Sequence, residues 1–370
     1  MGKDRIDPLW TESALRVMNK ARCPILHTEK ARKSVPYSQD SLTVPTILIG
    51  PAPLRNRPGR YREILESAGF APLEVEGHNT LTEAELRGAL PRSDAMLAGG
   101  ELLSADMLDL APRLRAIVRT GVGYDAVDVA AATARKIVVG ITPGTNHESV
   151  AEHTFALLLC LTRNVVGNDR VIRAGGWDRS IVQPLRGKTL GLVGLGRIGR
   201  AVATRAIAFG MRVIAFDPVA DAEFDARQGI RRLAFEELLA ESDVVSLHVP
   251  LIDLTRGMIN RRTLALMRPG SLLINTARGG LVVEADLCTS LASGHLAGAG
   301  LDVLVDEPPR HDDPLLGLPN VVLSAHIAGI DTKAMADMAE KAAEVVVALY
   351  RGEWPADCIV NNELAGAWKW

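Results

Sequence analysis

The stretch Leu190-Gly191-Leu192-Val193-Gly194-Leu195-Gly196-Arg197-Ile198-Gly199 decides the fold of the chain. It ends an apolar run, opens an alanine-rich helical pattern, and spaces its glycines as Gly-x-Gly-x-x-Gly. In such a strand–turn–helix unit, Gly194 permits the tight turn, Gly196 lets the backbone approach a pyrophosphate, and Gly199 lets helix and strand pack closely. The N–H groups of the first helical turn, which include those of Arg197 and Ile198, attract an anion. The stretch therefore predicts a βα unit that holds the phosphates of a dinucleotide.

A carboxylate follows the next strand along the chain. Arg212–Phe216 is predicted to be that strand, and Asp217 comes directly after it. Dinucleotide-binding units place an acidic residue here to accept hydrogen bonds from the adenosine ribose. Because a carboxylate also repels a 2′-phosphate, the expected cofactor is NAD rather than NADP. The alternatives are an ordinary glycine-rich turn and an Asp217 that only starts the turn at Pro218.

Short apolar runs alternate with helical patterns on both sides of this unit. The patterns predict strands at 46–49, 73–75, 95–97, 116–118, 189–193, 212–216, 244–247, 271–274 and 321–323. Helices are expected at 61–68, 82–90, 104–110, 127–135, 148–172, 197–209, 235–240, 262–267, 284–293 and 333–350. Such alternation indicates βαβ units around parallel sheets. The long helix 148–172 is expected to form a spine between two lobes.

Composition narrows the possible partners and location. The chain has 370 residues, a net charge of −2 and four scattered cysteines, Cys23, Cys160, Cys288 and Cys358. This charge gives no reason to expect nucleic acid or an anionic membrane as partner, and no apolar run reaches the ~20 residues that span a bilayer. The cysteines form no CxxC pair, so no metal site is expected. Lone cysteines suit a reducing compartment, so a cytoplasmic location is expected.

Three groups with the chemistry of keto-acid reduction follow predicted strands in the second half of the chain. Arg278 follows the strand 271–274, Glu307 lies after the segment Gly300-Leu301-Asp302-Val303, and His326 follows the strand 321–323. Ligands of open parallel sheets bind beyond the carboxyl ends of the strands. A protonated imidazole can supply the proton that balances hydride addition to a ketone, and a neighbouring carboxylate orients the ring and favours its charged form. A guanidinium can clamp the acid group.

Each of these residues also has a simpler interpretation. Arg278 can form a surface ion pair, Glu307 can be a solvated loop charge, and His326 can be a satisfied polar residue at the end of a strand. Asp302 can contact the nicotinamide carboxamide or merely cap a turn. The functional interpretation rests on the order of these residues along one predicted sheet.

These segments resemble the D-isomer-specific 2-hydroxyacid dehydrogenases, the family that includes D-3-phosphoglycerate dehydrogenase and glyoxylate/hydroxypyruvate reductase. The resemblance covers about residues 46–362 and rests on motifs in the family's order: 193–199, Asn275-Thr276-Ala277-Arg278-Gly279, Leu301-Asp302-Val303 and Ala325-His326. Thr120-Gly121-Val122-Gly123-Tyr124-Asp125 and His248-Val249-Pro250-Leu251 with Thr255-Arg256 are similar to the family as well. Formate dehydrogenases of the superfamily carry glutamine at the position of Glu307, so that relative is disfavoured.

The resemblance implies two doubly wound parallel-sheet α/β domains. A Rossmann-type NAD-binding domain at 146–330 is inserted into a flavodoxin-like substrate domain at 46–145 and 331–370, after an N-terminal extension at 1–45. It implies substrate binding by Gly99, Gly100 and Arg278, and an acid–base pair of Glu307 and His326. The implied cofactor contacts are Gly194, Gly196, Arg197, Ile198, Gly199, Asp217, Val249, Pro250, Thr255, Thr276, Ala277, Asp302 and Gly329.

The expected function is therefore hydride transfer between NAD(H) and a small D-2-hydroxy or 2-keto acid, of the 3-phosphoglycerate, hydroxypyruvate or glyoxylate class. The family also implies a homodimer, which residues 164–177 are expected to mediate. A different class of function stays open at this point: an NAD-responsive binding protein of the corepressor type, built on the same fold.

Overall fold

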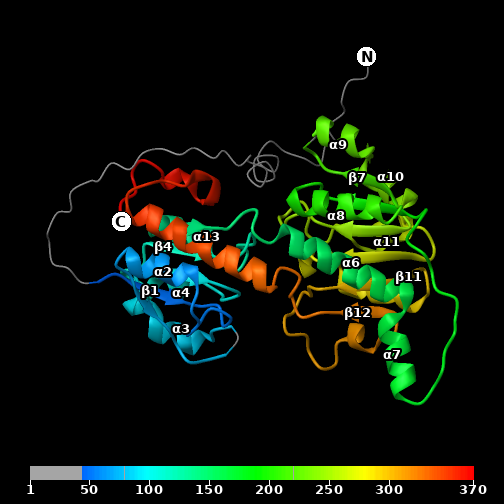
Figure 1. Cartoon of the computed structure of the whole chain (residues 1–370), viewed down its shortest axis with the longest axis horizontal. Helices are drawn as coiled ribbons and strands as arrows, with labels where there is room; N and C mark the ends of the chain where they lie inside the picture. Colours follow the sequence, from blue (N-terminus) through cyan, green and yellow to red (C-terminus); the bar gives the residue numbers. More distant parts are fainter. Residues whose placement is uncertain (1–43, 79, 220) are drawn as a thin grey trace. The chain divides into compact units, whose positions relative to one another are not determined.

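The computed structural model describes residues 44–78, 80–219 and 221–370, and these residues form two compact units (Figure 1). One unit comprises His147–Asp331, and the other comprises residues 44–146 together with Thr332–Trp370. The first unit is thus inserted in the chain between the two segments of the second. The predicted extension at 1–45 lies almost entirely outside the described residues.

Five parallel strands form the sheet of the unit that contains residues 44–146. Their order is β2-β1-β3-β4-β5, and every neighbouring pair is parallel. This is the flavodoxin-like order. The strands are β1 (Thr46–Ile49), β2 (Ala71–Leu73), β3 (Ala95–Ala98), β4 (Ala116–Arg119) and β5 (Val138–Gly140).

Helices cover both faces of this sheet because its strands are apolar on both sides. Ile47 and Ile49 belong to the core shared with α2 and α13, whereas Leu48, between them, belongs to the core on the opposite face. The helices are α2 (Arg60–Ser67), α3 (Glu83–Ala89), α4 (Ala105–Asp109), α5 (Val129–Ala134) and α13 (Thr332–Tyr350). The return of the chain in α13 therefore completes a unit that residues 44–146 begin.

Seven parallel strands form the sheet of the inserted unit. Their order is β12-β11-β10-β9-β6-β7-β8, which is the Rossmann order with one further strand at the β12 edge. They are β6 (Thr189–Val193), β7 (Arg212–Phe216), β8 (Arg231–Arg232), β9 (Val244–Leu247), β10 (Ser271–Asn275), β11 (Leu296–Leu301) and β12 (Val321–Leu323). The expected fold class of two doubly wound parallel sheets is confirmed.

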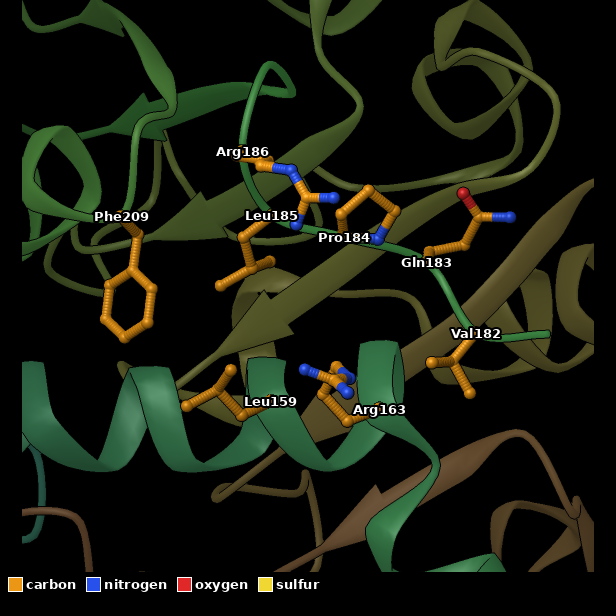
Figure 2. Close-up of a pocket in the computed structure, with 8 residues that line it drawn as sticks. All are labelled: Leu159, Arg163, Val182, Gln183, Pro184, Leu185, Arg186 and Phe209. Atoms are coloured by element: carbon orange, nitrogen blue, oxygen red, sulfur yellow. The ribbon is translucent and has the colours of Figure 1, made fainter. Parts of the chain in front are cut away.

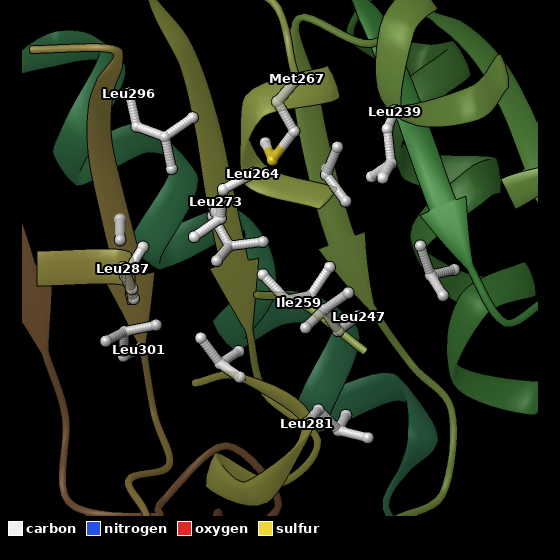
Figure 3. Close-up of a cluster of buried hydrophobic side chains, with 14 of the residues drawn as sticks. Leu239, Leu247, Ile259, Leu264, Met267, Leu273, Leu281, Leu287, Leu296 and Leu301 are labelled. Atoms are coloured by element: carbon white, nitrogen blue, oxygen red, sulfur yellow. The ribbon is translucent and has the colours of Figure 1, made fainter. Parts of the chain in front are cut away.

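Two apolar layers enclose this second sheet. Figure 3 shows the layer in which Leu247, Leu273 and Leu301 of the sheet meet side chains of α10, α11 and α12. The opposite layer joins the sheet to α6 and α8. The helices are α6 (His147–Arg163), α7 (Val165–Arg173), α8 (Arg197–Ala208), α9 (Ala222–Gln228), α10 (Phe235–Glu241), α11 (Arg261–Leu266) and α12 (Glu284–Ala292).

The predicted single helix 148–172 is wrong. The helix breaks at Asn164, whose φ of 49° is left-handed and cannot continue an α-helix, so α6 and α7 are separate. The predicted spine is also corrected in part, since α6 packs on α8, β10, β11 and β12 of its own unit.

Short 3-10 helices complete the secondary structure: η1 (Leu90–Arg92), η2 (Gly279–Leu281), η3 (Pro314–Gly317), η4 (Ala356–Cys358) and η5 (Asn362–Leu364). In the described ranges, no helix is both long enough and apolar enough to cross a membrane.

Candidate active site

The glycine-rich loop after β6 has the backbone that a bound dinucleotide requires. Gly194 has a φ of 99°, and a Cβ there would lie 2.7 Å from the carbonyl oxygen of His248. A Cβ on Gly199 would lie 2.2 Å from the carbonyl oxygen of Gly194, so only glycine allows α8 to pack this closely on the loop. A Cβ on Gly196 would instead meet open space. Gly194 and Gly199 therefore lie close to protein backbone, whereas the space next to Gly196 is open.

The first turn of α8 begins directly after the glycine-rich loop. Its N-cap is Gly196, which makes no side-chain cap hydrogen bond, and Arg197 and Ile198 are the first helical residues. The positive end of the helix dipole attracts phosphate groups. These features fit the diphosphate of NAD(H).

Asp217 lies at the carboxyl end of β7, directly beside this loop. Its Oδ2 accepts a hydrogen bond of 2.7 Å from the Leu195 amide, and its Oδ1 accepts one of 2.8 Å from the Val219 amide. The carboxylate is therefore held against the glycine-rich turn, in the position that the ribose role requires.

Two of the other predicted cofactor residues hold loops in place. Thr255 is fully buried, and its hydroxyl donates to the carbonyl of Pro250 over 2.6 Å. The hydroxyl of Thr276 lies 3.2 Å from that of Thr154 on α6. Side chains engaged in this way shape the loops that follow β9 and β10.

The remaining predicted cofactor positions lie in the loops after β9, β10 and β12. Val249 is buried, and its neighbour Pro250 is exposed. Ala277 follows β10, and Gly329 follows β12. The residue before Val249 is His248, which directly follows β9. Burial lowers the pKa of His248 to about 3 and so keeps its imidazole neutral.

The structure brings His326 and Glu307 together. His326 Nδ1 lies 2.7 Å from Glu307 Oε2, and the two side chains are 47% and 38% exposed. The other carboxylate oxygen, Oε1, accepts a 3.0 Å hydrogen bond from the Leu304 amide. Among the residues that the structure describes, none forms a hydrogen bond with His326 Nε2, so this nitrogen is the one that can meet a substrate.

The charge of Glu307 is stabilised by its neighbours. Partial burial raises the pKa of Glu307. The hydrogen bond and charge of His326 lower it, as do the Leu304 amide and the charge of Arg278. Together these contacts outweigh burial, and the pKa of Glu307 lies below its usual value. The carboxylate therefore stays ionised beside the imidazole over the neutral pH range.

Arg278 follows β10 in a loop that packs tightly on the Glu307 loop. A Cβ on the next residue, Gly279, would lie 2.0 Å from the carbonyl carbon of Leu304, so glycine is required for this approach. Arg278 Nη1 donates to its neighbouring carbonyl at Ala277 over 2.6 Å, and the side chain is partly exposed. The guanidinium thus lies near the acid–base pair, as its effect on Glu307 also indicates.

Asp302 is buried, and its carboxylate is hydrogen-bonded to the loop that contains His326. It is 1% exposed, and its carboxylate accepts hydrogen bonds from the amides of Ile327 and Ala328 and from the hydroxyl of Ser324. Its carbonyl also accepts the His326 amide over 2.8 Å. This carboxylate therefore holds the His326 loop, in which His326 has a left-handed φ of 54°. The expected contact of Asp302 with the nicotinamide stays a prediction.

Sequence reasoning missed two partners of Asp302. His153 on α6 places Nε2 2.8 Å from the Ser324 hydroxyl and 3.4 Å from Asp302 Oδ1. Ser324 directly follows β12, and a polar residue directly after a strand of a parallel sheet is a candidate site residue. Nothing in the local sequence of α6 singles out His153.

The loop after β3 contains the two other residues predicted to bind substrate, Gly99 and Gly100. The Gly99 amide donates a hydrogen bond to Glu101 Oε2 over 2.5 Å. Its contact with the substrate stays a prediction. Gly100 lies in the same loop, and a Cβ there would lie 3.5 Å from the Thr80 hydroxyl.

A separate hollow lies away from these strand ends. Figure 2 shows it between α6 and the segment that precedes β6, with apolar side chains and arginines around it: Leu159, Arg163, Val182, Gln183, Pro184, Leu185, Arg186 and Phe209. Phe209 follows the end of α8, whereas the glycine-rich loop precedes its start, so this hollow is not the dinucleotide site. In the part of the chain that the structure describes, no cluster of His, Cys, Asp or Glu is suited to a metal ion.

Comparison with known proteins identifies the inserted unit. The family model described as "D-isomer specific 2-hydroxyacid dehydrogenase, NAD binding domain" matches residues 155–328. Among solved structures, D-lactate dehydrogenase from Aquifex aeolicus, complexed with NAD and lactic acid, has a TM-score of 0.74 and 29% identity. The match covers 85% of this chain and 98% of that one.

Curated relatives extend the similarity beyond that unit. A glyoxylate reductase of Korarchaeum cryptofilum is 43% identical over 268 residues, which are 71% of this chain and 80% of the reductase. A D-3-phosphoglycerate dehydrogenase of Mycobacterium leprae is 41% identical over 302 residues, which are 79% of this chain. The match covers 57% of that dehydrogenase, so the chain spans little more than half of its length.

Proposed function

The chain belongs to the D-isomer-specific 2-hydroxyacid dehydrogenase family, and on this premise we propose that Arg278, Glu307 and His326 carry out the reduction of a small 2-keto acid with NADH. The relatives include a glyoxylate reductase, a D-3-phosphoglycerate dehydrogenase and a D-lactate dehydrogenase complexed with NAD, so the corepressor alternative is not favoured. The observation that carries the proposal is the 2.7 Å hydrogen bond between His326 and Glu307 at the carboxyl end of the sheet.

NADH, when bound, supplies the hydride, and the protein must supply the proton. Glu307 holds Nδ1–H of His326, which leaves Nε2 as the donor to the ketone oxygen. The ionised carboxylate favours the imidazolium, and this is the form that can give up a proton. In the direction of oxidation, neutral His326 takes the proton from the hydroxyl at the same nitrogen.

Arg278 binds the substrate in this proposal. Its guanidinium presents parallel N–H groups that match the two oxygens of a carboxylate, and its charge stabilises the negative charge that develops on the ketone oxygen. Gly99, Gly100 and the loop that contains them are proposed as further substrate contacts.

We assign cofactor binding to residues 146–330 and substrate binding to residues 46–145 and 331–370. The glycine-rich loop holds the diphosphate, and Asp217 accepts hydrogen bonds from the ribose. Because Asp217 carries a negative charge next to that sugar, NAD is favoured over NADP.

We also propose a homodimer in the cytoplasm. No residue of α7 is buried, and the chain beyond it exposes Trp177 by 79% and Ile181 by 97%. Apolar side chains exposed in this way are typical of an interface. The described cysteines Cys160 and Cys288 are free thiols, as is usual in a reducing compartment. Sedimentation of the full chain tests the dimer, and a monomer mass would contradict it.

The function is tested by following NADH consumption with glyoxylate, hydroxypyruvate, 3-phosphohydroxypyruvate and pyruvate. We expect reduction of at least one of them, with NADH at least about tenfold more efficient than NADPH because Asp217 opposes the extra phosphate. Reduction of none of these acids would overturn the proposed function. Equal efficiency with NADPH would show that Asp217 does not face the ribose.

A further inference from the structure

A chain of hydrogen bonds joins helix α6 to the loop that contains His326. His153 on α6 places Nε2 2.8 Å from the Ser324 hydroxyl, and this hydroxyl lies 2.6 Å from Asp302 Oδ1. The same carboxylate oxygen lies 3.4 Å from His153 Nε2. These residues and His326 all belong to the unit His147–Asp331, so the whole chain of contacts lies within one compact unit.

The direction of these hydrogen bonds follows from the chemistry of the three side chains. Burial raises the pKa of Asp302, but hydrogen bonds from His153, Ser324 and two backbone amides outweigh burial, and the pKa lies below its usual value. The carboxylate is therefore ionised and can only accept hydrogen bonds. Ser324 has a single hydroxyl hydrogen and donates it to Asp302, so its oxygen accepts from His153. His153 therefore carries a hydrogen on Nε2.

Asp302 holds the loop on both sides of His326. Ser324 binds its carboxylate two residues before His326, whereas the amides of Ile327 and Ala328 donate to it over 2.9 Å and 2.8 Å directly afterwards. Between these contacts, His326 has a left-handed φ of 54°. Residues other than glycine seldom adopt this conformation, and it persists only where the surroundings fix it. The position of the Asp302 carboxylate therefore decides how the His326 ring is presented.

His153 differs from the other donors around Asp302. Ser324, Ile327 and Ala328 all belong to the His326 loop, so they would move with it. His153 comes from α6, a helix of 17 residues that packs on β12. The side chains of His153 and Asp302 are 20% and 1% exposed, so the contact between them is largely shielded from water, and hydrogen bonds are stronger in such surroundings.

We propose that His153 is a positioning residue whose Nε2–H holds Ser324 and Asp302, and through them the loop of His326, against α6. Its contacts keep His326 in the orientation in which Nε2 can meet a substrate. The proposal rests on the proposed function, in which His326 transfers the proton.

The test combines hydrogen exchange of residues 324–330, followed by mass spectrometry, with kcat for a 2-keto acid that the wild type reduces. In His153→Ala we expect the amides of Ile327 and Ala328 to exchange at least about tenfold faster, because the loop opens more often. We expect kcat to fall about tenfold, because His326 is then misplaced. His153→Gln keeps an N–H donor of similar reach and should restore most of both properties.

His295→Ala is the matched control. His295 is a partly buried histidine of the same unit, and its Nε2 lies 3.0 Å from the carbonyl oxygen of Leu264. It directly precedes β11, whereas His326 lies beyond the carboxyl end of β12. Its replacement should leave kcat and the exchange of residues 324–330 unchanged.

The outcomes separate this proposal from the function on which it rests. If the wild type reduces no 2-keto acid, the proposed function fails, and the exchange measurement still shows whether His153 holds the loop. Unchanged exchange or unchanged kcat in His153→Ala would overturn the role of His153, as would a His153→Gln variant as impaired as His153→Ala. If His153→Ala does not fold, Ser324→Ala removes the bridging hydroxyl and leaves α6 intact. Unchanged exchange in Ser324→Ala would overturn the proposal equally.

Discussion

Replacing His326 with alanine should lower kcat for 2-keto acid reduction by about 10²–10⁴-fold at every pH, because the proton donor is removed. His326 is the residue whose Nε2 is free to reach a substrate while Nδ1 is held by Glu307. The affinity for NADH, measured by fluorescence titration, should change little, since the predicted dinucleotide loop lies after β6 on another part of the sheet.

His311→Ala is the matched control for this variant. His311 is an exposed histidine in the segment between Glu307 and His326, and nothing assigns it a role in the reaction, so its loss should leave kcat near that of the wild type. Near-normal turnover in His326→Ala would remove the proposed proton transfer altogether.

Replacing Arg278 with lysine should lower kcat/KM by about 10²-fold although the positive charge survives, because an ammonium cannot reproduce the paired N–H groups of a guanidinium. We expect a higher KM for the 2-keto acid and a lower kcat, since the same clamp orients the ketone. Steady-state kinetics at fixed, saturating NADH measure both quantities.

Arg310→Lys provides the corresponding control. Arg310 is an exposed arginine that pairs with Asp312 in the loop after Glu307, so its replacement tests the general effect of the exchange. It should leave both constants nearly unchanged. A collapse of NADH affinity in Arg278→Lys would place Arg278 in the cofactor site or in the fold rather than at the substrate.

Most strands could be predicted because their apolar runs and the turns between them are local signals. The edge of the second sheet shows where such signals fail. β11 has the sequence Leu-Ala-Gly-Ala-Gly-Leu, whose small residues are rare in strands and predict no strand. A Cβ on Gly300 would lie 2.9 Å from the Leu157 side chain of α6, so tertiary packing selects this glycine.

The candidate site was predictable to the extent that strand order brings distant loops together. Arg278, Asp302 and His326 follow β10, β11 and β12, which are neighbours in the sheet. The direction of each side chain was not predictable. Asp302 accepts the Ile327 amide and Glu101 accepts the Gly99 amide, because hydrogen bonds made only in the folded chain decide where a buried carboxylate lies.

In the proposed reaction, His326 supplies the proton, and the charge of Glu307 keeps His326 able to do so. The most direct test is the pH dependence of kcat/KM for reduction in the wild type and in Glu307→Gln. The lowered pKa of Glu307 keeps its carboxylate ionised above acidic pH, so the wild-type imidazolium has a negative partner throughout the measured range.

Glutamine removes that charge, so the imidazolium should lose its proton more readily. The decline of reduction at high pH should therefore begin at a lower pH in Glu307→Gln, with measurable activity kept near the acidic end. A decline at the same pH in both proteins would contradict the proposed role of Glu307, because it would show that the carboxylate does not act on the histidine.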